Sequence, residues 1–299
     1  MSTTKPEASA SPAPPVRHRR NLAGPLGLAP FSIYVVLFLA LPTVLAIATG
    51  LFDANGNLTA DNFAALGDPT ILGTFWTSVW ISLLTAAIGA VVGSLVCYAM
   101  LGMSATHPVR VVVDAAAGVF AQFGGVMLAF LFIATIGANS LVTKGLKGAG
   151  IDIYASGMWL YDVPGFIMPY LYFQIPLMII TFGPAMGALK SQWAEANLSL
   201  GGTRRTFWTR IGIPVLAPSF VASYLLLFAN SFSAYATAAA LASQGSQIVP
   251  LQIRTALTSE TVLGRANLAG ALAAGMIIVM AVVMSGYYVV QRRADRWRS

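Results

Sequence analysis

Six long apolar runs constrain this chain more than any other feature of its sequence. Each is long enough to cross the hydrocarbon core of a membrane, which takes about 20 residues in helical form. They lie near residues 28–50, 76–101, 111–137, 163–187, 214–241 and 267–290. Inside a bilayer the backbone has no water to bond, so spans of this length are expected to be helices. The chain is therefore predicted to be an all-α, polytopic membrane protein with six transmembrane helices.

The composition excludes a soluble globular protein. Hydrophobic residues make up 57% of the 299 residues and charged residues only 9%, whereas soluble chains carry roughly 25% charged residues. The net charge of +7 is compatible with binding to nucleic acid, but the basic residues are scattered over the loops between the apolar runs. The positive-inside bias of membrane proteins explains that distribution better, so no nucleic-acid partner is expected.

The same basic residues predict the orientation of the chain. With six spans and an inside N-terminus, thirteen of the seventeen basic residues fall in inner segments. The outer segments keep only Lys144, Lys147, Arg254 and Arg265. Both termini and the loop after the fourth span are therefore expected to be cytoplasmic. A cleaved signal peptide is the rival interpretation of the N-terminus, but the run at about 26–51 is longer than the apolar region of a signal.

The chain is expected to divide into four parts. Residues 1–24 are polar and rich in Pro, Ala and Ser, which predicts a disordered cytoplasmic tail. Residues 25–71 hold the first transmembrane helix and an outer loop, residues 72–291 hold a core of five transmembrane helices, and residues 292–299 form a basic cytoplasmic tail. No outer loop is long enough to form a folded domain, so high-affinity capture of a solute is expected from another protein.

The longest polar and basic segment between two apolar runs is 191–218, SQWAEANLSLGGTRRTFWTRIGIPVLAP. Good helix formers at 194–200 predict a short helix. Gly201-Gly202 can end it, because glycine takes the left-handed conformation that closes a helix. Pro214 stands at the head of the next apolar run, where a missing N–H costs little. We expect a short helix, a turn and a return into the membrane at Pro214.

This segment resembles the cytoplasmic coupling loop of permeases of binding-protein-dependent ABC importers. Glu195-Ala196, Gly201, Ile211 and Pro214 fit the pattern E-A-A-x3-G-x9-I-x-L-P of that family. Asn197 replaces the second alanine of the pattern and Ile213 replaces its leucine. In the order of its spans the resemblance extends over roughly residues 72–291. The alternative interpretation of this segment is a solvated basic loop, as in a membrane protein without a docking partner, with snorkelling arginines.

The resemblance implies the type I ABC importer permease fold, with a coupling loop at 190–214 that docks an ATP-binding subunit. The residues implied to dock that subunit are Glu195, Ala196, Gly201, Arg204, Arg205, Ile211 and Pro214. A second permease subunit, identical or different, an extracytoplasmic solute-binding protein and a location in a bacterial plasma membrane are implied as well. Leu200 before Gly201 resembles the spermidine/putrescine, sulfate and iron branches, so a polyamine-like solute is expected. A sugar, sulfate, iron or phosphonate remains the alternative.

Polar side chains within the apolar runs are candidates for lining a solute pathway. They are costly in hydrocarbon unless they face the bundle or a wet cavity. The candidates are Gln122, Gln174, Asn230, Ser233 and Tyr235. Serine and threonine in such runs, including Ser231 and Thr237, more often join helices. Gly89 and Gly93 form a GxxxG pattern, which predicts close packing of two helices.

The sequence contains no set of residues for catalysis. It lacks the G-x-x-x-x-G-K-[ST] phosphate loop, so the chain is not expected to hydrolyse ATP alone. Two histidines and one cysteine are too few for a metal cluster, and no cofactor is expected. Cys97 is predicted to be a core side chain, and Asp114 to pair with Arg110 four residues earlier. A stand-alone secondary carrier would need coupling acids inside the spans, and these are absent.

Overall fold

The computed structural model describes residues 23–295 apart from 54, 243–247 and 259–264. The regular elements among these residues are helices, and the only bridge between extended segments among them joins Phe52 and Leu58. The described chain holds six helical segments long and apolar enough to cross a membrane, Leu28–Thr49, Pro69–Ala99, Gly125–Gly148, Val163–Gly187, Arg204–Leu241 and Asn267–Tyr288. The prediction of an all-α protein with six transmembrane helices is confirmed. Most of the predicted N-terminal tail and residues 296–299 lie outside the described residues.

The chain forms two compact units, Met1–Leu45 and Ala46–Ser299. The described part of the first unit contains α1 (Ala23–Val35), a π-helical turn η1 (Val36–Ala40) and the start of α2 (Leu41–Thr49). None of the side chains of Leu28–Thr49 in the apolar window is buried. Since these side chains are apolar, the segment suits a surrounding of lipid.

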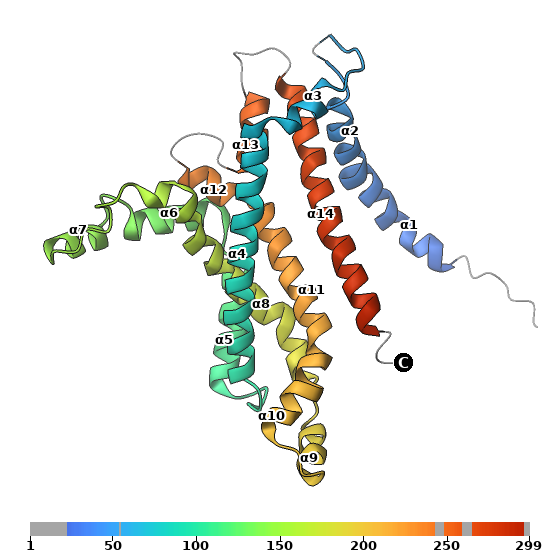
Figure 1. Cartoon of the computed structure of the whole chain (residues 1–299), viewed down its shortest axis with the longest axis vertical. Helices are drawn as coiled ribbons and strands as arrows, with labels where there is room; N and C mark the ends of the chain where they lie inside the picture. The colour runs from blue at the N-terminus through green and yellow to red at the C-terminus, as the bar shows by residue number, and fades with distance from the viewer. Residues whose placement is uncertain (1–22, 54, 243–247, 259–264, 296–299) are drawn as a thin grey trace, which may run out of the picture. The chain divides into compact units, whose positions relative to one another are not determined.

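The second unit is built around three long helices, α4 (Pro69–Ala99), α8 (Ile167–Gly187) and α11 (Ile213–Phe232). The most extensive packing joins α4 to α8, followed by α4 to α11, and the three lie side by side in Figure 1. Gly89 and Gly93 are buried on the face of α4 that meets α8. A Cβ atom at Gly93 would lie only 2.5 Å from Met178 Cβ of α8. The close packing predicted from the GxxxG pattern is confirmed.

The third predicted span, 111–137, is wrong as a single helix. It consists of α5 (Pro108–Phe120) and α6 (Gly125–Ile136), separated by a break at residues 121–124. Gly124 has an extended backbone and Gly125 has a φ of 71°. Glycine adopts a positive φ without the steric cost that other residues incur, so this pair can interrupt the helix.

The fifth predicted span, 214–241, begins in the wrong place. The helix starts at α10 (Arg204–Phe207) and continues through the π-helical turn η5 (Trp208–Gly212) into α11. Thr203 starts it by accepting a hydrogen bond from the Thr206 N–H at 3.3 Å. Pro214 therefore lies inside a continuous helix, next to a π turn whose shifted hydrogen bonds are a common site of helix irregularity. A second break at 233–235 separates α11 from α12 (Ala236–Leu241).

The remaining described helices are α3 (Asp61–Ala64), η2 (Ala65–Gly67), α7 (Leu141–Gly148), η3 (Trp159–Tyr161), η4 (Val163–Phe166), α9 (Ser191–Ser199), α13 (Val249–Thr258) and α14 (Arg265–Asp295). Residues 292–295 of the predicted C-terminal tail thus belong to α14. Asp68 begins α4 by accepting a hydrogen bond from the Thr70 N–H at 2.7 Å. That bond holds the pKa of the Asp68 carboxyl below its ordinary value.

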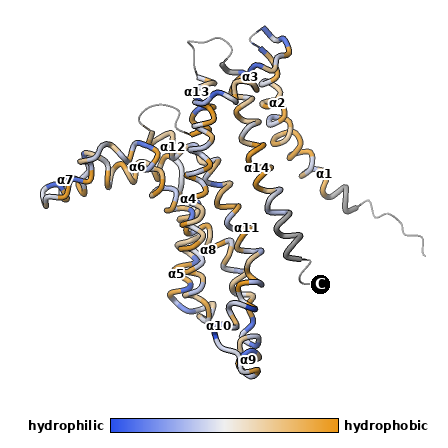
Figure 2. Tube along the Cα trace, in the orientation of Figure 1, coloured by the Kyte–Doolittle hydropathy of each residue, from blue (hydrophilic) through white to orange (hydrophobic). Residues whose placement is uncertain are grey.

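The second unit carries its polar segments at two opposite ends. At one end, α9 and α10 lie near the turn that follows α4 (Figure 1). At the other end, the Val249 N–H of α13 donates to Ser78 Oγ near the start of α4, at 2.8 Å. There Asn267 of α14 also donates to the carbonyl oxygens of Phe52 and Asp53, each at 2.9 Å. Figure 2 shows hydrophilic residues gathered at α9, at α10 and in the loop before α3.

Candidate functional site

The α9 loop (residues 190–214) contains a short helix that ends as the sequence predicts. α9 begins at Ser191, and Gly201 follows it with a φ of 77°. The Gly202 N–H donates to the Asn197 carbonyl at 2.8 Å. A left-handed glycine with hydrogen bonds back into the last turn is the usual end of a helix.

Asn197, which departs from the family pattern, fixes the geometry of this loop. Its side-chain amide donates to the Thr203 carbonyl at 3.0 Å, and Thr203 is the residue that starts α10. The end of α9 and the beginning of the next helix are thereby held together by one side chain. Sequence reasoning treated Asn197 only as a deviation, although an amide six residues before a helix start offers this bridge.

Arg204 ties the α9 loop to the core of the bundle. Its Nη2 donates to the Tyr98 hydroxyl near the end of α4, and its Cζ lies 6.0 Å from the centre of the Tyr98 ring. Trp208 packs edge-on against the same ring, with 5.3 Å between ring centroids. Guanidinium–aromatic contacts of this kind are favourable. Tyr98 was not predicted, because a tyrosine in an apolar run gives no signal of such a partner.

The outward side of the α9 loop is open and partly apolar. Leu198 is 62% exposed and Leu200 is 89% exposed, and Glu195 is exposed beside them. A shallow groove of about 380 Å³ runs between α9 and the following helix, lined by Trp193, Ala196, Asn197, Leu200, Ile211 and Val215. Of the other predicted docking residues, Arg205 and Pro214 are exposed and Arg204 faces Tyr98.

Four of the five predicted pathway residues line one cavity. This break cavity has a volume of about 320 Å³ and lies where the breaks at 121–124 and 233–235 meet. Its lining includes Gln122, Asn230, Ser233 and Tyr235, together with Phe173 of α8. Two hydrogen bonds hold the breaks in place. Thr237 Oγ1 donates to the Gly125 carbonyl at 3.2 Å, and the Tyr170 hydroxyl donates to the Ala234 carbonyl at 3.0 Å.

Gln174, the fifth candidate, is placed elsewhere. Its side chain is fully buried between α4 and α11, where its amide lies 2.8 Å from Thr85 Oγ1. With its nitrogen turned to the other side, the amide also donates to the Leu227 carbonyl at 3.1 Å. Thr85 in turn lies 3.1 Å from Ser231 Oγ. These three side chains form a satisfied buried network that joins α4, α8 and α11.

We expect Gln174 to act on stability and not on solute handling. Gln174→Leu keeps most of the side-chain volume, and Thr85 keeps its bond to the Ile81 carbonyl, so the free energy of unfolding should change by less than about 1.5 kcal/mol. Gln174→Ala leaves a cavity and should cost about 2–3 kcal/mol. Thermal unfolding in detergent measures both. An altered apparent KM for solute in the leucine variant would place Gln174 in the pathway after all.

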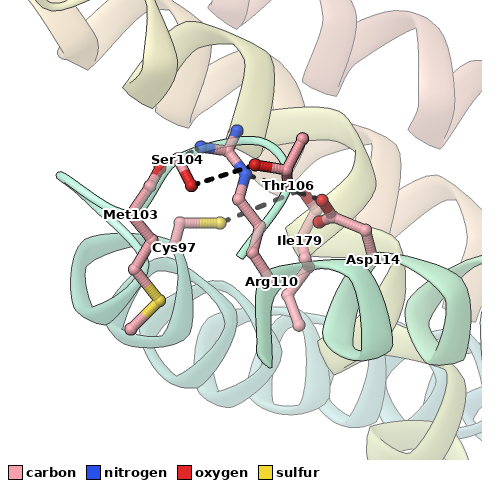
Figure 3. A network of polar contacts seen from close by, with 7 residues as sticks. All are labelled: Cys97, Met103, Ser104, Thr106, Arg110, Asp114 and Ile179. Carbon is pink, nitrogen blue, oxygen red and sulfur yellow. Dashed lines mark hydrogen bonds and ion pairs between the residues drawn. The ribbon is translucent and has the colours of Figure 1, made fainter. Parts of the chain in front are cut away.

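A larger cavity, of about 630 Å³, lies between the ends of α4 and α8 and the start of α5. Figure 3 shows its polar contacts. Arg110 Nη1 donates to the Met103 carbonyl at 2.9 Å, and Arg110 Nε lies 3.7 Å from Asp114 Oδ2. The predicted Arg110–Asp114 pair is confirmed. Cys97 is buried beside this cavity, as predicted for a core side chain.

Comparison with known proteins gives the following matches. No family model matches the chain. The molybdenum transport system permease protein ModB of Mycobacterium tuberculosis is 25% identical over 166 residues, which cover 54% of this chain and 57% of ModB. This chain thus spans little more than half the length of that relative. The trehalose transport system permease protein SugB of the same species is 24% identical over 240 residues, covering 79% of this chain and 78% of SugB.

Solved structures match over more of the chain. The crystal structure of a bacterial ABC transporter that imports the acidic polysaccharide alginate matches with a TM-score of 0.73 at 17% identity, covering 92% of this chain and 96% of that chain. A structure of an alginate transporter in complex with an alginate pentasaccharide-bound periplasmic protein matches with the same TM-score at 15% identity. The chain therefore has the fold of the transmembrane subunits of ABC importers, and its sequence relatives are ABC transporter permeases.

Proposed function

We propose that the chain is the membrane-spanning permease subunit of an ABC importer. It would pass a small polar solute, delivered by an external binding protein, and depend on a separate ATP-binding subunit. The observation that carries this proposal is the built α9 loop. A short exposed helix is closed by Gly201, bridged by Asn197 to the next helix and tied by Arg204 to α4.

The geometry of the loop suits the transmission of movement. An ATPase that docks on Glu195 and the exposed leucines would move α9. Asn197 connects α9 to the start of the helix that continues into α11, and Arg204 connects that start to the end of α4. That movement would therefore reach α4 and α11. Binding energy from the ATPase would then shift the bundle between inward-open and outward-open states. A loop without such contacts would bend under the same load.

The partners follow from the same proposal. One solved alginate transporter is in complex with a periplasmic solute-binding protein, which supports a binding protein outside for this chain as well. Residues 72–291 would form the permease core. A second permease subunit, a copy or a different chain, would complete the pathway. The α9 end would face the cytoplasm of a bacterial cell, with both termini on that side, because the basic residues concentrate there.

The proposal names the solute only as a small polar molecule. The relatives named above are permeases for molybdenum and trehalose, and the solved transporters import alginate. None of them supports the polyamine expected from Leu200-Gly201, which stays a prediction.

Charge reversal in the α9 loop tests the docking proposal. Glu195→Lys should lower the amount of ATPase that co-purifies by about tenfold, since loss of a charge-paired contact costs ~1.4 kcal/mol or more. Insertion into the membrane should be unchanged because Glu195 is exposed. Asp61→Lys, an exposed charge reversal in α3 before the second span, is the matched control.

The orientation is tested separately by thiol labelling. In a Cys97→Ala background, Ser199→Cys on the exposed side of α9 should react with a membrane-impermeant maleimide only from the cytoplasmic side. Asn57→Cys in the exposed loop before α3 should react only from the opposite side. Labelling of Ser199→Cys in intact cells, or solute transport by the purified chain without an ATPase, would refute the importer proposal.

A further inference from the structure

We infer that the break cavity takes an uncharged solute rich in hydroxyl groups, such as a sugar, in place of the polyamine expected from Leu200-Gly201 and not an oxyanion. This inference rests on the proposed function, because it names the solute class of that pathway. Three properties of the described lining carry it: the absence of charge, the direction of the hydrogen bonds and the presence of unpartnered amides.

The first property is charge. None of the described residues that line the break cavity is acidic or basic, and α8 and α11 contain no charged side chain. A solute with several ammonium groups would lose its hydration there without meeting a carboxylate, which is strongly unfavourable. The nearest acid in the same run, Asp114, lines the other cavity and is paired with Arg110.

The second property is the direction of hydrogen bonds. Ser233 Oγ donates to the Ala229 carbonyl at 2.9 Å and Thr237 Oγ1 donates to the Gly125 carbonyl at 3.2 Å. Each hydroxyl has one donor and two acceptor lone pairs, so these two hydroxyls have only acceptors left for a solute. Acceptors suit the O–H groups of a sugar. An oxyanion offers acceptors alone and finds no donor at these two hydroxyls, and no described residue of the lining is basic.

The third property is the state of Gln122 and Asn230. Within the described chain neither side-chain amide makes a hydrogen bond, although Asn230 is half-buried and Gln122 exposed. Unpartnered amides do not face lipid without a large cost, so this surface requires water, a solute or another protein. An amide offers donors and an acceptor together, as a hydroxyl group does, and Phe173 and Tyr235 supply aromatic surface for the apolar faces of a sugar ring.

The cavity is also of a suitable size. A volume of about 320 Å³ lies at the lower end of the range of small-molecule pockets, about 300–1,000 Å³. An oxyanion with a single metal atom, such as molybdate, would leave most of this volume to water.

Protection of a cysteine tests this inference on the full-length chain in nanodiscs. Ala121 lines the cavity, so Ala121→Cys in a Cys97→Ala background reports its occupancy through the rate of modification by a small thiol reagent. The probes are glucose, trehalose and raffinose, with molybdate and spermidine as the charged alternatives. A sugar at about five times its Kd should slow modification on the order of sixfold, and the two charged solutes should not.

Asn230→Asp provides a matched variant of nearly equal size. It replaces the amide by a carboxylate, so it should weaken protection by sugar and create protection by spermidine. Protection by spermidine or molybdate in the parent chain, or by no probe at all, overturns the inference. If such a failure occurs while ATPase docking is intact, the proposed importer function stands. If sugar protects the cysteine but the ATPase does not dock, the importer proposal is refuted and the sugar site is retained.

Discussion

Replacing Gly201 with valine is expected to detach the chain from its ATPase, with about a tenfold loss of co-purified ATPase. Gly201 holds a φ of 77° at the end of α9, and a left-handed conformation costs a non-glycine residue about 1–2 kcal/mol, more when it is β-branched. No atom lies within 4 Å of a Cβ built at this position. The substitution therefore acts on the backbone of the loop end alone and leaves the packing of the bundle untouched.

Gly201→Asn is the control that isolates the backbone effect. The asparagine side chain is at least as large as that of valine, but asparagine tolerates the left-handed region. Gly201→Asn should therefore keep most of the ATPase bound. Pull-down of the ATPase from membranes, normalised to the amount of inserted chain, compares the two. Equal binding by the valine and asparagine variants would show that docking does not depend on how α9 ends.

The sequence predicted the membrane-spanning helices because their signal is long and repeated. Runs of more than twenty apolar residues leave little choice, and the helix formers before Gly201-Gly202 locate α9 correctly. The helix breaks at 121–124 and 233–235 were not predicted. Hydropathy averages over about twenty positions, and a break of three or four residues is too short to lower that average below the value of a membrane span. The adjacent glycines Gly124 and Gly125 are the signal that was available.

The start of the fifth span was missed for a related reason. Arg204, Arg205 and Arg210 made residues 204–212 look like a loop, whereas the structure continues the helix through them and caps it at Thr203. A helix that leaves the membrane keeps its hydrogen bonds while its side chains become polar. Hydropathy reports the boundary of the membrane and not the end of the helix, so Pro214 was assigned to a helix start.

The candidate pathway residues show what sequence alone distinguishes. Polar side chains within apolar runs are expected to avoid lipid. Gln174 is buried in the bundle, and the other four line the break cavity. Whether such a side chain faces a cavity or a neighbouring helix depends on its direction around the helix axis. Asn230 and Gln174 carry the same functional group, yet Asn230 lines the break cavity and Gln174 is enclosed by Thr85 and Leu227. Only the contacts between helices separate the two cases.

The second large effect is expected at Gly93, where α4 and α8 approach most closely. Gly93→Leu would place its Cβ 2.5 Å from Met178 Cβ and 2.9 Å from the Ile175 carbonyl, and backbone atoms cannot give way as a flexible side chain does. Overpacking of this kind costs about 1–3 kcal/mol or more, which corresponds to a fall in Tm of roughly 2–5 °C for a chain of this size. Thermal unfolding of the purified chain in detergent measures it.

Gly73→Leu on the same helix is the matched control, because no atom lies within 4 Å of a Cβ at Gly73. It should shift Tm by no more than about 1 °C. Equal shifts for the two variants would mean that α4 tolerates bulk on its α8 face and that the close approach is not a feature of the folded bundle. The position also bears on function, since α8 carries Phe173 at the break cavity and leads directly into α9. A partly folded Gly93→Leu chain should therefore lose solute protection and ATPase docking together, whereas Gly201→Val should lose docking alone.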